Sequence, residues 1–295
     1  MRILRDIAES SVSIWAWLST VCIVLVLAIY SCFLFLRGFS SLKMSLFFGD
    51  ADPWLAFLVR VPVWDGIWPA AVGTVLLVIM SGAMTIPVGI MAGIYLSEYS
   101  SGLFSEVADT AIDLLAAMPS IVMGLFGFTL ILLLKKTVVP SANVGLMPAA
   151  FCLAILSLPY MVKTTKLALG NIDPNRRLTG LTLGFNRLQN IIYVLFPASG
   201  REILNGVILT IGRSAEDTAV ILLTGVVANA GIPSGINDKF EAIPFFIYFT
   251  ASEHKTVEEL DKGFGAAIVL LLVAGSLFML SKIIGKTVNR STGVR

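Results

Sequence analysis

The stretch Leu204–Val227, LNGVILTIGRSAEDTAVILLTGVV, indicates the class of protein and where its chemistry lies. It is long enough to cross a bilayer, whose core of about 30 Å needs about 20 apolar residues in a helix. It nevertheless contains three ionisable side chains, those of Arg213, Glu216 and Asp217. Charged groups inside a membrane span are costly and usually functional. The stretch therefore predicts a membrane protein with a polar site within one helix.

The composition of the whole chain supports a membrane protein. Of 295 residues, 57% are hydrophobic and 14% are charged, whereas about a quarter of the residues in soluble domains are charged. A water-soluble globule and a disordered chain are both excluded. The net charge of +2 is too small to indicate a nucleic-acid partner. No spacing of Cys, His or acidic residues predicts a metal site, and no nucleophile–base pattern predicts a catalytic residue.

Apolar stretches of spanning length predict an all-α integral membrane protein with six transmembrane helices. These stretches are Ser13–Leu36, Gly66–Leu96, Ala111–Leu134, Val144–Val162, Leu204–Val227 and Phe264–Ile284. An even number of spans places both termini on one side. Twelve Lys and Arg residues fall on that side and eight on the other, with Arg213 inside a span, so both termini are expected to be cytoplasmic. The apolar segment Ile243–Thr250 is too short to span and is expected to be re-entrant or interfacial.

The segment Lys163–Arg201 is the longest and most basic stretch on the predicted inner side. Apolar residues recur at helical spacing within Phe185–Phe196, and Gly184 permits a tight turn before them. The pattern predicts a compact knob made of a short amphipathic helix, a turn at Gly184 and a second helix ended by Pro197. The alternative is a loop that merely connects two spans.

The charged cluster of the fifth predicted span allows two interpretations. Arg213 and Asp217 are four residues apart, and Glu216 is also within reach of Arg213 on a helix. With Thr218 they would form a substrate pathway or gate on a cavity wall, or they would be an ion pair that only fixes helix packing. Two acids already neutralise one arginine. A gate in which Arg213 exchanges acidic partners is therefore at least as plausible as direct anion binding.

The residues of the knob and three other segments resemble a known family. Gly184 and Pro197 have the spacing of the cytoplasmic signature of permease subunits in binding-protein-dependent ABC importers. More narrowly, Ala92–Tyr99, Pro119–Gly127 and Thr218–Thr224 resemble PstA-type permeases of phosphate importers. The resemblance extends from about Gly66 to the carboxyl terminus.

This resemblance implies a type I ABC importer permease fold in a bacterial inner (plasma) membrane. It divides the chain into a first helix and outer loop (1–65), a permease core (66–284) with a cytoplasmic coupling segment at about 163–203, and a cytoplasmic tail (285–295). It also implies three partners, namely a second PstC-like permease, a homodimeric ATPase and an extracytoplasmic phosphate-binding protein. The chain itself would bind no cofactor, because ATP and Mg²⁺ belong to the ATPase.

The resemblance also implies roles for individual residues. Arg213 aligns with an intramembrane arginine of the family, and Asp217 occupies the position of its usual glutamate. The residues expected to couple the chain to the ATPase are Arg176, Arg177, Leu178, Thr179, Gly180, Gly184, Arg187, Gln189 and Pro197.

The sequence departs from the family pattern at three places. Leu178-Thr179-Gly180 stands where the signature usually has Glu-Ala-Ala, so the usual acidic contact to the ATPase is absent. Glu216 replaces a small residue, and Lys166 stands where the family often has an acid. A sulfate or molybdate permease, an ion-coupled secondary transporter and a non-transporting membrane scaffold remain as alternatives.

Overall fold

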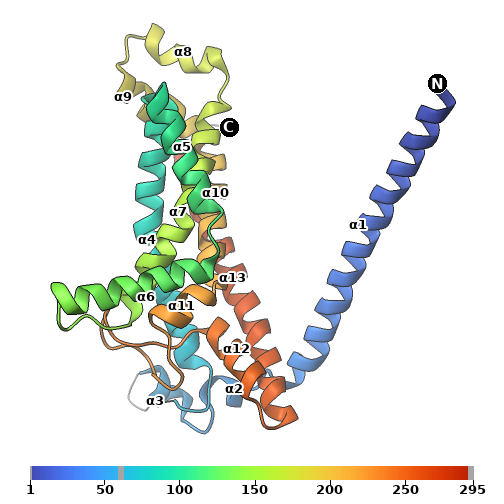
Figure 1. Ribbon diagram of the computed structural model, residues 1–295, viewed down its shortest axis with the longest axis vertical. Coiled ribbons are helices and arrows are strands. Elements are labelled where there is room, and N and C mark those ends of the chain that lie inside the picture. The colour runs from blue at the N-terminus through green and yellow to red at the C-terminus, as the bar shows by residue number, and fades with distance from the viewer. Residues whose placement is uncertain (1, 59–62, 292–295) are drawn as a thin grey trace.

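The computed structural model describes residues 2–58 and 63–291, and in these residues the protein is helical with no β-strand (Figure 1). Six of the described helices are long and apolar enough to cross a membrane, which confirms the all-α class and the expected number of candidate spans. The elements are α1 (Arg2–Gly38), η1 (Phe39–Ser41), α2 (Met44–Phe48), α3 (Pro53–Phe57), α4 (Trp68–Glu98), α5 (Leu103–Ala116), α6 (Ser120–Thr137), α7 (Leu146–Gly170), α8 (Pro174–Thr182), α9 (Arg187–Asn190), η2 (Ile191–Leu195), α10 (Phe196–Glu216), α11 (Ala219–Thr224), α12 (Ile243–Glu253) and α13 (Val257–Ser291).

The centre of the molecule is formed by α4, α7 and α10, which run along its long axis and pack against one another. Small residues bring α4 and α7 close together: a side chain at Gly89 would collide with Met161, and one at Gly93 would collide with Thr165. Close approach through small residues is the usual way in which membrane helices gain packing contacts. The largest apolar cluster also joins these two helices and includes Leu77 of α4 and Leu153 of α7.

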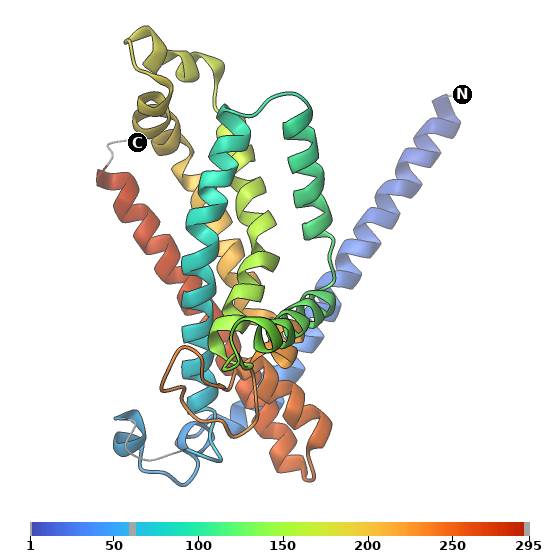
Figure 2. The same ribbon diagram turned by 60° about the vertical axis from the view of Figure 1, so that its left-hand side comes forward.

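The first helix, α1, stands apart from the bundle along most of its length (Figures 1 and 2). Near its carboxyl end Leu34 is buried, and the ring of Phe33 meets that of Phe264 of α13 edge-on, with centroids 5.5 Å apart. Arg37 pairs with Asp261 at 3.2 Å. The apolar side chains along Val12–Ile29 are largely exposed in the isolated chain.

The third predicted span, Ala111–Leu134, is not one helix. Its residues belong to α5, which runs along the bundle, and to α6, which lies across it (Figure 2). The break falls at Pro119, whose backbone is extended (φ −60°, ψ 136°). Proline removes a helical N–H and disfavours helix in the residue before it, and this accounts for the difference.

The fifth predicted span, Leu204–Val227, is also divided. α10 begins earlier, at Phe196, and ends at Glu216 because the backbone of Asp217 is extended (φ −74°, ψ 116°). The remainder forms α11, a short helix that packs against α6.

The prediction that Pro197 ends a helix is wrong. Pro197 lies in the first turn of α10, and α9, η2 and α10 follow one another without interruption. η2 is π-helical. Such a wider turn gives room for the ring of Pro197 and tolerates the missing helical hydrogen bond, because the proline nitrogen has no hydrogen to donate.

The two ends of the molecule differ in what they carry. The start of α1, the end of α13 and the helices α8 and α9 lie at one end, and α2, α3 and α12 lie at the other (Figures 1 and 2). The predicted tail 285–295 continues α13 as far as Ser291, and residues 292–295 lie outside the described residues. The segment Ile243–Thr250 is the greater part of α12, which packs against α13.

Candidate functional site

Arg213 lies in the last turn of α10. Its Nη2 is 3.6 Å from Asp217 Oδ2 and its Nη1 is 3.9 Å from Glu216 Oε1. Both distances exceed hydrogen-bond length. Arg213 Nε is buried and has no hydrogen-bond partner in the described part of the chain. The guanidinium, with five N–H donors, thus retains donors for a further acceptor.

Asp217 has a structural role that the sequence did not indicate. Its Oδ1 accepts a hydrogen bond from the backbone N–H of Val220 at 2.9 Å, within the first turn of α11. The side chain is 3% exposed. A carboxylate that accepts from the first turn of a helix stabilises that helix. Asp217 is therefore fixed in place at the junction of α10 and α11.

The side chains of Glu216 and Thr218 are less constrained by their surroundings than that of Asp217. The side chain of Glu216 is 69% exposed, and its ion pair with Arg213 is the longer of the two. Thr218 is half-buried and starts α11 without a capping hydrogen bond from its side chain. Glu216 can thus leave Arg213 at little cost, whereas Asp217 cannot.

A hollow of about 580 Å³ opens beside Arg213 and Glu216. Tyr160 of α7 and Asn205 of α10 line it together with Ile208, Leu209, Gly212 and Phe278. Tyrosine and asparagine both offer hydrogen-bond donors. The hollow therefore combines one cation, one mobile acid and two neutral polar groups with otherwise apolar walls.

The knob has the form that the sequence predicts up to its second helix. α8 ends at Thr182, and Gly184 turns the chain with φ +83°, a value that favours glycine. Asn186 and Gln189 then form a capping box at the start of α9, with hydrogen bonds of 2.8 and 3.0 Å. These local bonds fix the direction in which α9 leaves the turn.

The exposed surface of this knob carries apolar side chains among polar ones. Leu178, Leu181, Leu183, Leu188 and Tyr193 are exposed, as are Arg176, Thr179 and Arg187. Exposed apolar patches on a polar segment mark interaction surfaces. The knob therefore has the surface of a docking element.

Arg177 and Gly180 face the other way, toward the bundle. Arg177 Nη1 donates to both carboxylate oxygens of Glu98, at the end of α4. Gly180 is buried against Asn190, and a side chain at this position would collide with Asn190 Oδ1. Two of the residues expected to contact the ATPase thus hold α8 to the rest of the chain.

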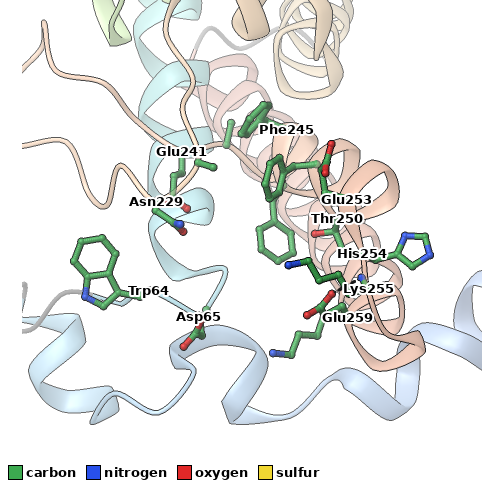
Figure 3. Close-up of a pocket in the computed structure, with 16 residues that line it drawn as sticks. Trp64, Asp65, Asn229, Glu241, Phe245, Thr250, Glu253, His254, Lys255 and Glu259 are labelled. Carbon is green, nitrogen blue, oxygen red and sulfur yellow. Dashed lines mark hydrogen bonds between the residues drawn. The ribbon is translucent and has the colours of Figure 1, made fainter.

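The end of the molecule opposite α8 holds a pocket of about 440 Å³, called here the distal pocket (Figure 3). Phe245 and other aromatic residues of α12 form one wall of the pocket. Trp64 and Asp65 lie on the side opposite α12, and His254 points away from the pocket. Glu241 is buried and accepts from the N–H of Gly231 at 2.8 Å. Burial raises the pKa of the Glu241 carboxyl above its usual value, opposed by weaker effects of backbone N–H groups.

The site includes residues that sequence reasoning missed. Tyr160 and Asn205 are polar residues in apolar stretches, and Asn205 is eight residues before Arg213. That spacing is close to two helical turns and could have indicated a shared face. Glu98 gave no such signal, because its partner Arg177 is 79 residues away in the sequence.

Known proteins agree with this fold. Residues 85–293 match the family described as binding-protein-dependent transport system inner membrane component. The chain belongs to this family and is a membrane permease component of a transport system. Two solved structures share its fold: a MetNI methionine ABC transporter (TM-score 0.56, 16% identity, covering 83% of this chain and 100% of the other) and a bacterial ABC transporter that imports alginate (0.62, 14%, 97% and 99%). The expected type I ABC importer permease fold is confirmed.

Within that family the chain is similar to PstA permeases. It is 32% identical to the phosphate transport system permease protein PstA of Pasteurella multocida, over 70% of this chain and 72% of the relative. The corresponding values for PstA of Mycobacterium leprae are 31%, 71% and 67%. For the probable PstA of Methanocaldococcus jannaschii they are 26%, 76% and 78%.

Proposed function

We propose that this chain is one of two permease subunits of an ATP-driven phosphate importer and forms half of the translocation pathway with a second, PstC-like permease. The relatives named above are phosphate permeases. The observation that carries the proposal is Arg213, a cation whose Nη1 and Nη2 atoms lie beyond hydrogen-bond distance of both acids and which lines an open hollow within a candidate span. Guanidinium groups suit the oxygens of phosphate in charge and geometry.

Passage of the anion would depend on a difference between two acids, because the side chain of Glu216 can move and that of Asp217 is fixed. Asp217 stays bound to the first turn of α11, while exposed Glu216 moves away and leaves Arg213 open to phosphate. Asn205 and Tyr160 provide hydrogen-bond donors on the wall of the hollow. When Glu216 returns to Arg213, it competes with the anion and favours its release. Arg213 thus serves both as a transient binding group and as part of a gate.

ATP would be hydrolysed by a homodimeric ATPase that binds ATP and Mg²⁺ and docks on the knob. Leu178 occupies the place of the usual acid and is exposed with Leu181 on α8. We expect the contact to be more apolar than the family signature implies. The exposed Arg176 and Arg187 would add charge at its edge.

The orientation follows from the same docking. α8 lies at the end that holds the start of α1 and the end of α13, so both termini would be cytoplasmic in a bacterial inner membrane. The distal pocket would then face outward, toward the extracytoplasmic phosphate-binding protein. Its exposed acidic residues Asp65, Glu253 and Glu259 outnumber Lys255 and Lys262, which favours a partner surface that is basic at this point.

The test is ATP-dependent uptake of labelled phosphate by vesicles containing both permeases and the ATPase, with the binding protein added outside. Arg213→Gln should lower uptake at least tenfold while assembly is unchanged. Lys136→Gln is a matched control, because Lys136 is an exposed residue at the end of α6. Normal uptake by Arg213→Gln would contradict the proposed role. Equal competition by sulfate or molybdate would contradict the proposed substrate.

A further inference from the structure

The inner end of α4 is joined to α8 by a charged contact, here called the clamp, formed by Glu98 and Arg177. Arg177 Nη1 donates to Glu98 Oε1 at 2.8 Å and to Oε2 at 2.9 Å. Ser97 Oγ donates to the same carboxylate at 2.9 Å. The Glu98 side chain is 13% exposed. A half-buried, charge-assisted contact of this kind is stronger than an exposed ion pair.

The same guanidinium also holds α7. Arg177 Nη2 donates to the carbonyl of Leu169, in the last turn of α7, at 2.7 Å. A cation near the carboxyl ends of two helices is favoured by the partial negative charge of both ends. Nearby, Leu169 packs with Ile191 and Leu195 in an apolar cluster that Ile94 of α4 also joins. α4, α7 and α8 therefore meet at Arg177.

The backbone of Arg177 is held from the opposite side. Asn190 Nδ2 donates to the Arg177 carbonyl at 3.0 Å, and Asn190 is buried. The lack of a side chain at Gly180 allows Asn190 to lie against α8. One residue thus ties α8 to α4 and α7 through its side chain and to the start of the α9–α10 helix through its carbonyl.

We propose that Arg177 is a positioning residue that makes α8 move as one body with the inner ends of α4 and α7, and that it does not bind the ATPase. The inference rests on the proposed function, in which the ATPase pushes on α8. A displacement of α8 would be transmitted through α7 to the translocation pathway, because Ser157 Oγ on α7 lies 3.3 Å from the Oγ of Ser214, the residue next to Arg213. It would also pass through α4, which packs against both α7 and α10.

The first test compares clamp variants by the phosphate taken up for each ATP hydrolysed. Arg177→Gln and Glu98→Gln should leave assembly and ATP hydrolysis within twofold of the unmodified complex but lower uptake per ATP at least fivefold. The double variant should be no worse than either single variant, and the exchange Glu98→Arg/Arg177→Glu should restore part of the loss. Hydrolysis is followed as ADP, since released phosphate is also the substrate. The matched control is Arg201→Gln, because Arg201 is an exposed cation on α10.

Two results would overturn the clamp. One is unchanged uptake per ATP in both single variants. The other is loss of the ATPase on purification with Arg177→Gln but not with Glu98→Gln, which would indicate a direct contact. An unmodified complex that fails to transport phosphate would instead contradict the proposed function.

A distance measurement tests the clamp without relying on the clamp variants. Spin labels on Met91 of α4 and Asn175 of α8, both exposed and neither in the proposed ATPase contact, would be introduced after Cys22, Cys32 and Cys152 are replaced by serine. In the unmodified clamp the label distance should stay the same and narrowly distributed in the nucleotide-free and ATP-trapped states. A shift between these states would show that α8 moves independently of α4 and would overturn the proposal.

Discussion

Arg213 has two acidic neighbours, and their different surroundings give them different duties. Spacing along a helix predicted that Asp217 and Glu216 would lie near Arg213, and both do. It could not predict that the helix ends between the two acids, because this depends on the hydrogen bond from Val220 to Asp217. The sequence likewise could not predict that Tyr160 of α7 lines the hollow beside Arg213, since this depends on how two helices pack.

Replacement of Asp217 tests its structural duty. Asp217→Ala removes the acceptor for Val220 N–H, and the loss of a helix cap costs about 0.5–2 kcal/mol. We expect the free energy of unfolding in detergent to fall by about that amount, measured by thermal and denaturant unfolding. Asp217→Asn keeps an acceptor oxygen and should recover most of the loss. Glu216→Ala is the matched control and should change stability by less than about 0.5 kcal/mol; equal losses at both positions would contradict the assignment.

The buried Glu241 predicts a dependence of stability on pH. Because its pKa is raised in the folded protein, the folded state binds a proton more readily than the unfolded state. Stability should therefore fall as pH rises from the ordinary glutamate pKa through the raised value. Glu241→Gln should raise the melting temperature at pH 7.5, and this gain should shrink near pH 4.5. Glu253→Gln serves as the control, since Glu253 is exposed at the same pocket; a gain independent of pH would refute this explanation.

At the scale of single elements, apolar length predicted where helices lie better than where they end. The stretches Gly66–Leu96 and Val144–Val162 are close to α4 and α7 in position. The errors at Pro119 and Pro197 have opposite causes: one proline breaks a helix, whereas the other is accommodated by the π-helical turn η2. Sequence alone does not distinguish them, because the outcome depends on the backbone before each proline.

Close packing of α4 on α7 gives a prediction for Gly89. A side chain there would come within 2.6 Å of Met161 Cβ and Cγ, and overpacking of this kind costs about 1–3 kcal/mol. Gly89→Ala should lower the melting temperature in detergent. Gly82→Ala on the same helix would meet Ile86 at an ordinary 3.6 Å, so it should be neutral or stabilising by up to about 1 kcal/mol. A neutral Gly89→Ala would contradict the packing of these two helices.

At the scale of the whole molecule, the chain has the form of a component that needs partners. α1 stands away from the bundle with its apolar surface exposed, and the knob of α8 and α9 projects with exposed leucines. We expect lipid and the second permease to cover the first surface, and the ATPase the second. Hydropathy predicted six apolar segments of spanning length, but not how far α1 departs from the other helices, since that depends on contacts beyond this chain.

The most direct test of the account compares the chain purified alone with the same chain purified with its companions. Both samples are reconstituted into vesicles, and uptake of labelled phosphate is measured with and without ATP on the ATPase side and the binding protein on the other. The account predicts uptake only in the complete complex and only with ATP. Phosphate uptake by the isolated chain, driven by an ion gradient at the rate of the complex, would contradict it.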